Sequence, residues 1–189
     1  MSRLVTNAIR STAASSDAIT IDSAGKPSFP NGGVGKILQV INSIKTDVGS
    51  AGASSNFVDI SGLSVSITPT SSSSKILISC NITAGHSATS NVFGFRLMRD
   101  STAIAVADAA GNRRQWTFAE MTAHSNTNNT THSVGGTFLD SPSTSSAVTY
   151  KLQLYNRYNT VYINRSGEDS NSDNHGRGVS SITVMEVAA

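Results

Sequence analysis

The sequence predicts an all-β protein, an antiparallel β-sandwich of jelly-roll-like type with a short extended segment at its N-terminus. Three features support this fold class: short runs of alternating apolar and polar residues, separators rich in Ser, Thr, Asn and Gly, and an almost complete lack of helical periodicity. Alternation with a period of two is typical of strands that bury one face. A length of 189 residues suits one sandwich, so we expect one core.

The N-terminal residues 1–33 differ in texture from the rest of the chain. Residues 1–16 show little periodicity, whereas AITIDSAGKPSFPNGG predicts a strand of about four residues, a turn around Gly25 and an exit rich in Pro and Gly. A lone short strand cannot bury itself. This segment is therefore either an anchor or interchain stem, which docks on a partner, on a copy of itself or on its own domain, or a mobile terminus, and the sequence leaves both readings open.

Residues 34–189 form the predicted sandwich domain, in which strand-like runs follow one another with turn residues between them. They are 36–44, 55–60, 63–68, 75–83, 92–100, 102–107, 115–123, 133–140, 147–156, 160–165 and 179–187. Helix-forming alanines occur in 103–114, but Gly111 and the alternation of Ile104 and Val106 favour a strand and a turn there. Regular spacing of this kind suggests a sandwich rather than alternating strands and helices.

The alternation also predicts which side chains face the core. In 63–68, Leu63, Val65 and Ile67 share one face. In 75–83, the single cysteine, Cys80, shares a face with isoleucines and is expected to be a buried core residue. In 147–156, Tyr150 lies with Leu152 and Leu154, whereas Tyr155 lies on the other face with Lys151 and Gln153 and is expected to be exposed.

Composition limits the possible partners. Charged residues make up 14% of the chain, compared with roughly 25% in an average soluble protein, and the net charge is +2. Arg113 and Arg114 form the only adjacent basic pair, so the basic footprint of a nucleic-acid binder is missing. No run approaches the roughly 20 apolar residues that span a bilayer, and no signal peptide is visible. We therefore expect no nucleic acid, no membrane insertion, and assembly inside a cell.

The sequence offers no catalytic or cofactor motif. NGGVGKI lacks the Ser or Thr of a phosphate-binding loop, and the serines show no nucleophile elbow. The carboxylates are scattered, mostly at strand ends where an acid commonly satisfies a turn. They include Asp100, Asp108, Glu120, Asp140 and Glu186. We expect a non-enzymatic protein without a cofactor.

The four histidines do not predict a metal site either. His86, His124, His132 and His175 lie in or beside predicted loops, where surface exposure is the default. His124 and His132 could meet across a hairpin, and a threefold axis could gather copies of one histidine. No spacing of His with His or with a carboxylate supports a metal, so we expect none.

Two polar loops on the rigid frame, 124–131 and 165–178, are the candidate binding loops. The alternative is that they are only solvated. The candidate contact residues are Asn126, Asn128, Asn129, Tyr155, Glu168, Asp169, Asn171, Asp173, Asn174 and His175. Tyr155 could stack on a sugar ring, and it could equally pack between subunits.

Several segments together resemble a domain of tail-fibre or head-fibre virion proteins of tailed bacteriophages, of the cyanophage and marine-phage type. They are VGKILQVINSIKTD, FVDISGLSVSITPTSSSSKILISCNI, FRLMRDSTAI and YINRSGEDSNSDNHGRGVSSITVMEVAA. The resemblance covers 34–189. It implies a homotrimer that is fastened to other virion proteins through 1–33 and binds a host-surface polysaccharide, located in the virion and assembled in the host cytoplasm.

Three rivals remain open from the sequence. The first is a capsid decoration or other structural virion protein with no receptor role, in which the two polar loops could be replaced without loss of infection. The second is a cellular carbohydrate-binding lectin. The third is an enzyme acting on a capsular polysaccharide. It is the weakest, because such an enzyme needs a pair of carboxyl groups about 5 to 10 Å apart and the scattered carboxylates indicate no such pair.

Overall fold

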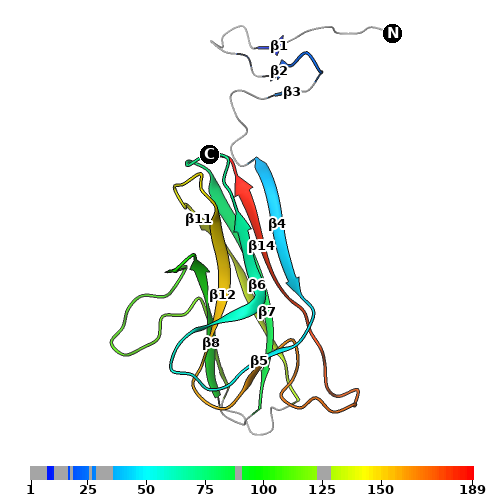
Figure 1. The fold of residues 1–189 in the computed structure, drawn as a ribbon, viewed down its shortest axis with the longest axis vertical. Coiled ribbons are helices and arrows are strands. Elements are labelled where there is room, and N and C mark those ends of the chain that lie inside the picture. The colour runs from blue at the N-terminus through cyan, green and yellow to red at the C-terminus, as the bar shows by residue number, and fades with distance from the viewer. Residues whose placement is uncertain are drawn as a thin grey trace.

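The computed structural model describes residues 8–10, 17, 19–25, 27–28, 36–87, 91–122 and 129–189. Within these ranges all the regular secondary structure is strand, and no helix is long and apolar enough to cross a membrane. The strands are β1 (Ala8–Ile9), β2 (Ile19–Ile21), β3 (Pro27–Ser28), β4 (Ile37–Lys45), β5 (Gly49–Ala51), β6 (Val58–Ile67), β7 (Lys75–His86), β8 (Asn91–Arg99), β9 (Thr102–Ile104), β10 (Phe118–Thr122), β11 (His132–Asp140), β12 (Val148–Asn156), β13 (Val161–Ile163) and β14 (Ser180–Val187) (Figure 1).

Two antiparallel sheets make up the body. The first has the order β10-β8-β12-β6, with β9 paired to β8. The second has the order β4-β14-β7-β13-β5, with β11 paired to β7. Each named pairing is antiparallel. The predicted all-β antiparallel sandwich is therefore confirmed.

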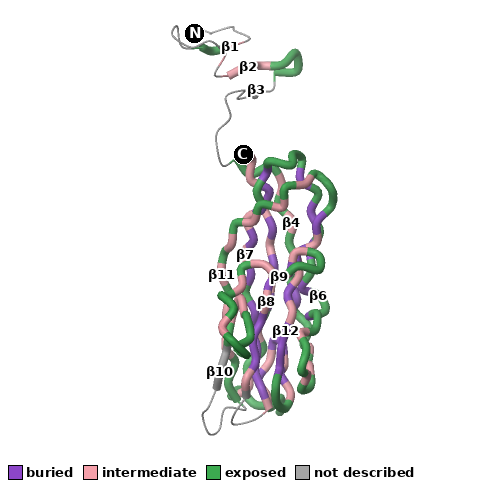
Figure 2. The backbone as a smooth tube through the Cα atoms, turned by 90° about the vertical axis from the view of Figure 1, so that its left-hand side faces the viewer, coloured by how far each residue is buried: buried purple, intermediate pink, exposed green. Residues whose placement is uncertain are grey.

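The core lies between the two sheets and follows the predicted alternation. Leu63 and Ile67 of β6 are buried, and so are Cys80 of β7 and Tyr150 of β12. Buried backbone runs along the length of the body in Figure 2. Burial raises the pKa of the Cys80 thiol to about 11, which keeps it in the neutral form of a core residue. The core assignment of Cys80 is thus confirmed.

Some elements of the body depart from the sequence prediction. The runs 55–60 and 63–68 form one strand, β6, because Gly62 adopts a φ of +84° and the register against β12 shifts nearby, so the strand continues through a bulge. Strand β9 ends at Ile104, because Ala105 has a φ of +50°, and 105–107 are not strand. Strand β5 was not predicted, since GSA has no apolar alternation.

The N-terminal part forms a small sheet of its own. Strand β2 lies where the short strand was predicted, and β1 and β3 pair with its two sides. The predicted turn is present, with Gly25 at a φ of +78° and its N–H donating to Asp22 O at 2.9 Å. Figure 1 draws this sheet beyond the end of the body where the C-terminus lies. At that end Ala188 N donates to Lys36 O at 2.9 Å.

Candidate functional site

A long loop, residues 105–117, connects β9 to β10 and covers the outer face of β8 and β12; we call it the arm. Two hydrogen bonds join its legs, Ala107 N to Trp116 O at 3.1 Å and Gln115 Nε2 to Ala107 O at 2.7 Å. Its end is fixed on β8, because Thr117 N donates to Phe95 O at 2.9 Å. The same threonine accepts Leu97 N through its hydroxyl, also at 2.9 Å. The arm is therefore tied to the sheet through both the backbone and the hydroxyl of Thr117.

The indole of Trp116 occupies space that a glycine leaves open. Gly94 faces outward on β8, directly opposite Tyr155 on β12. A Cβ at Gly94 would overlap the six-membered ring of Trp116 and would lie 2.8 Å from Phe118 O. Only glycine lets the arm lie this close to the sheet.

Three aromatic rings pack together where the arm meets the sheet. The Trp116 and Tyr155 ring centroids are 5.5 Å apart at an interplanar angle of 88°, and Phe57 lies 5.5 Å from Tyr155. Phe57 belongs to the loop 52–57, which is held at the end of β12 by the bond from Ser54 N to Asn156 O at 2.7 Å. Edge-to-face packing of this kind stabilises the cluster beyond simple burial.

Tyr155 corrects one expectation. It does lie on the outer face with Lys151 and Gln153, as its strand position predicted. It is not exposed, however: only 5% of its surface is accessible, because Phe57, Trp116 and the guanidinium of Arg114 cover the ring. Alternation along the strand gave the correct face but could not reveal the arm that covers it.

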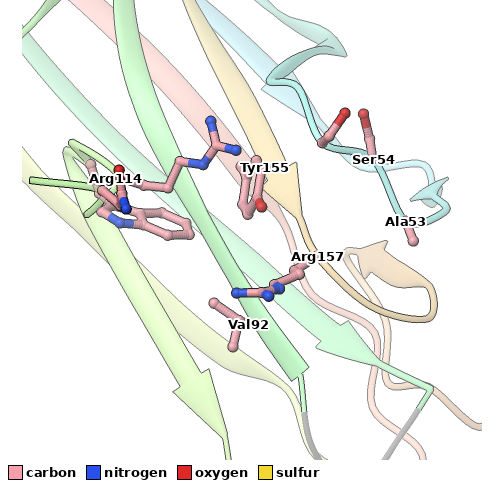
Figure 3. A pocket seen from close by; sticks show the side chains of 9 residues that line it. Ala53, Ser54, Val92, Arg114, Tyr155 and Arg157 are labelled. Atoms are coloured by element: carbon pink, nitrogen blue, oxygen red, sulfur yellow. The ribbon is translucent and has the colours of Figure 1, made fainter.

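Two hollows open beside this cluster and share Arg114. The larger, of about 500 Å³, is lined among others by Ser54, Asn112, Arg114, Tyr155 and Arg157 (Figure 3). The other, of about 490 Å³, is lined by Asn56, Phe57, Arg96, Arg113, Arg114 and Gln115. We call the two together the arginine groove. Figure 3 shows Arg114 beside the Tyr155 ring and Arg157 on the side of Val92.

Arg96 is the one groove arginine that has an acidic neighbour among the described residues. Its Nε donates to Gln153 Oε1 at 2.8 Å, and Gln153 Nε2 in turn donates to Asp59 Oδ1 at 2.6 Å. Burial lowers the pKa of Arg96, and the charge of Asp59 partly opposes this. A hydrogen bond from Lys151 is the main cause that lowers the pKa of Asp59. This row therefore holds two cations and one carboxylate, and Asp59 offsets only part of its positive charge.

The other three groove arginines have no acidic neighbour among the described residues. Among the described residues no ion pair involves Arg113, Arg114 or Arg157, and no Asp or Glu lines either hollow. The Arg114 guanidinium lies 4.6 Å from the Tyr155 ring centroid, and that of Arg157 lies 5.1 Å from the Tyr158 centroid. The groove is therefore electropositive, with two guanidinium groups held on aromatic faces.

The predicted loop 165–178 folds on itself. Asp169 accepts from Arg177 at 2.7 Å and lies 3.9 Å from Arg165, so it links the two ends of the loop. His175 Nδ1 lies 2.9 Å from Ser170 Oγ, and the His175 side chain is largely buried. The other candidates of this loop are exposed: Glu168, Asn171, Asp173 and Asn174. The loop thus gathers six predicted residues on a frame closed by its own contacts.

The remaining predicted contact residues belong to other segments of the chain, and the carbonyls of Thr130 and Arg165 both lie within 3 Å of the position that a Cβ at Gly85 would take, so the segment of Asn129 adjoins the start of that loop. Asn129 is exposed, and Asn126 and Asn128 lie outside the described residues. Tyr155 alone among the candidates lines the arginine groove. Sequence reasoning missed Phe57, Arg114, Trp116 and Arg157. The available signal was the adjacent pair Arg113–Arg114 just before the only tryptophan of the chain.

The four histidines were expected to be exposed at the surface, and the structure differs from this expectation in part. His86 is fully buried at the end of β7, where its ring lies 5.9 Å from Phe93 and stacks on His132 at 6.5 Å. The surface expectation is wrong for His86, because β7 extends beyond the predicted strand and carries this residue into the core. His124 lies outside the described residues. In the described ranges no three His, Cys, Asp or Glu side chains gather as metal ligands.

A second surface lies on the outer face of the other sheet. The register places Val40, Met185, Leu77 and Leu139 side by side across β4, β14, β7 and β11; we call them the apolar row. Val40 and Leu139 are 57% and 56% exposed. The adjacent row is polar and uncharged: Asn42, Thr183, Ser79 and Thr137. Of the outward-facing residues described on these four strands, Lys75 alone is charged.

No family model matches the chain, and no curated protein matches its sequence. Solved structures with a similar trace include the infectious bursal disease virus Gx strain, at a TM-score of 0.43 and 13% identity over 96% of this chain and 43% of that one. Another is the VP2 subviral particle of infectious bursal disease virus, at 0.40 and 10% over 79% and 41%. This chain spans less than half the length of either. At TM-scores below 0.5 these matches assign neither family nor function.

Proposed function

We propose that this chain is a non-enzymatic virion protein, a small fibre of a tailed bacteriophage that binds a host-surface polysaccharide. The observation that carries the proposal is the arginine groove. Its size suits a short oligosaccharide, since ligand sites commonly measure about 300 to 1,000 Å³. Its lining combines aromatic rings with hydroxyl, amide and guanidinium groups, which can contact both the ring faces and the hydroxyls of a sugar.

The chain path supports this arrangement. The start of β4 and the end of β14 lie at one end of the body, where Lys36 and Ala188 are bonded. Strand order and direction place Val92, Tyr155 and Arg157 toward the opposite end, where β7 ends and β8 begins. If residues 1–33 fasten the protein to other virion proteins, the groove lies on the side of the body toward the end that is farther from the particle.

We expect the full-length protein to bind at least one member of an immobilised panel of bacterial capsular polysaccharides and lipopolysaccharide O-chains. Ala53→Trp should weaken that binding by about tenfold or more, because Ala53 is exposed in the wall of the larger hollow and an indole there fills it. Surface plasmon resonance measures both proteins.

The matched control is Ala189→Trp, which adds the same side chain at the exposed C-terminus. Unchanged binding by Ala53→Trp would exclude the groove as the site. A protein that binds no polysaccharide yet is incorporated into virions would instead be the alternative, a capsid decoration or structural virion protein without a receptor role.

The homotrimer is the second part of the proposal, and the apolar row supports it. Four strands about 4.8 Å apart and eight residues long give a face of about 500 Å², before side-chain relief is counted. That approaches the roughly 800 Å² that each partner contributes to a stable interface. Because the face is almost uncharged, a second copy of the same chain can cover it without repulsion or buried unpaired charge.

The native mass tests this interface. We expect the full-length protein to show three times the chain mass of 19.7 kDa by light scattering, and the double variant Val40→Glu, Leu139→Glu to be a monomer. Two carboxylates in the apolar row would lose their hydration in the interface. Ser64→Glu, on the exposed outer face of the other sheet, is the control and should stay trimeric. A monomeric wild-type protein would contradict the trimer.

A further inference from the structure

We propose that the ligand of the arginine groove is anionic: Arg114 and Arg157 bind the carboxylates or sulfate groups of an acidic polysaccharide. This inference rests on the proposed function and specifies its substrate class. Some arginines pair with an acidic side chain of the protein, whereas others have no acidic partner and can pair with an anionic ligand.

The other described arginines have acidic neighbours. Arg99 pairs with Asp140 at 2.9 Å, Arg177 with Asp169 at 2.7 Å, and Arg165 and Arg10 lie 3.9 and 3.8 Å from Asp169 and Asp17. Arg96 is linked to Asp59 through Gln153. The three described arginines without an acidic partner, Arg113, Arg114 and Arg157, all line the arginine groove. In a chain with a net charge of only +2, this is a local concentration of positive charge.

The groove also orients two of these cations without using their donors. Arg114 stacks on Tyr155 and Arg157 lies over Tyr158, and no hydrogen bond between described residues involves either guanidinium. A guanidinium held by its face keeps its in-plane N–H groups available for bidentate binding of a carboxylate or sulfate. The backbone holds Arg157 as well, since its N–H donates to Val92 O at 2.9 Å. Because both side chains are already held in place, binding an anion costs little further side-chain conformational entropy.

The surroundings favour a sugar acid over a nucleic acid. Single-stranded nucleic acid is bound by long positive grooves that follow many phosphates. Here three unneutralised arginines lie around hollows of about 500 Å³ whose remaining lining includes Ser54, Ser55 and Asn112. These small polar groups can bond sugar hydroxyls around a charged substituent. A short acidic oligosaccharide therefore fits the charge, the size and the donors of the groove.

Tryptophan fluorescence gives a direct test, because Trp116 is the only tryptophan and lines the groove. The full-length protein is titrated with four probes: an oligogalacturonate, a sulfated heparin oligosaccharide, neutral dextran of similar length and a single-stranded oligonucleotide. We expect a saturable change with at least one acidic sugar and none with dextran. The two acidic probes separate carboxylate from sulfate recognition.

The arginines themselves supply the decisive variants. Arg114→Gln and Arg157→Gln should each weaken binding of the acidic sugar by about tenfold or more, the range of a lost charged hydrogen bond. Lys36→Gln removes the same charge at an exposed position outside the groove and should leave affinity within about twofold. Added salt should weaken binding by the wild type more than by the two arginine variants.

The outcomes separate the inference from the proposed function. If a neutral polysaccharide binds, is blocked by Ala53→Trp and is unaffected by Arg114→Gln, the anionic ligand is overturned while the glycan function stands. If the oligonucleotide binds more tightly than every sugar, the acidic-glycan assignment is wrong. If no polysaccharide binds at all, the proposed function fails together with the inference.

Discussion

Gly94→Ala is expected to unfold the arm from the sheet and to destabilise the protein by about 2 to 3 kcal/mol, within the range of overpacked sites. The new Cβ would overlap the Trp116 ring, and the neighbouring Phe118 O at 2.8 Å belongs to the paired strand β10. The indole must therefore leave its place against β8. Tyr155 and Arg114 would then lose the ring that completes their cluster, and the groove would lose its wall.

The emission spectrum of Trp116 and urea unfolding measure this change. We expect a red-shifted emission maximum together with a lower unfolding midpoint. Gly176→Ala is the matched control, because a Cβ at Gly176 meets nothing within 4 Å and should leave both values unchanged. An unshifted spectrum and wild-type stability in Gly94→Ala would show that the arm does not lie against Gly94 in solution.

The outer face of β8 and β12 shows what the sequence could and could not predict about the site. Period-two alternation placed Tyr155 correctly opposite the core side chains, because side-chain direction is set locally along a strand. Its covering groups come from Phe57 and from the arm, far away in the chain, and no local pattern encodes such contacts. From the sequence, RRQW could be recognised only as a basic pair close to an aromatic residue. The structure shows its role: Trp116 fills the space at Gly94, opposite Tyr155, and Arg114 covers the Tyr155 ring.

The fold was predictable for the same local reason, and its departures have local physical causes. Leu63, Val65 and Ile67 are buried as predicted, because one face of β6 covers the core. The break expected between 60 and 63 did not occur, since Gly62 accommodates a positive φ within the strand. Ala105 ended β9 early through a positive φ that alanine rarely adopts, so nothing in its residue type signalled the turn.

Among the scattered acids, the expectation that strand-end carboxylates satisfy turns is confirmed at Glu186. Asp100 Oδ1 instead accepts a strand amide, Thr149 N of β12, at 2.9 Å. Glu186, near the end of β14, is fully buried and accepts Thr70 N and Thr70 Oγ1, both at 2.7 Å, and Gln39 Nε2 at 2.6 Å. One carboxylate thus ties β4 and the turn after β6 to β14.

Glu186→Gln is therefore expected to lower the free energy of unfolding by about 3 kcal/mol at neutral pH. Burial alone would raise the pKa of Glu186, but hydrogen bonds from Gln39, Thr70 and Ser74 together outweigh it and lower that pKa to about 2. A glutamine would place an NH₂ group among these donors and remove the charge that they stabilise. Urea unfolding of both proteins measures the difference.

The pH dependence distinguishes the charge of Glu186 from a simple packing defect. Its pKa is lower in the folded state than the ordinary value of 4.5, so the stabilisation is complete above about pH 5 and is lost as the pH falls through 4.5 toward 2. The difference in the free energy of unfolding between wild type and Glu186→Gln should therefore decrease as the pH falls through that interval. Glu168→Gln changes an exposed loop carboxylate, and its free energy of unfolding should differ little from that of wild type at any pH. If the difference in the free energy of unfolding stays constant down to pH 2, the loss comes from a packing defect in the variant and not from the buried charge of Glu186.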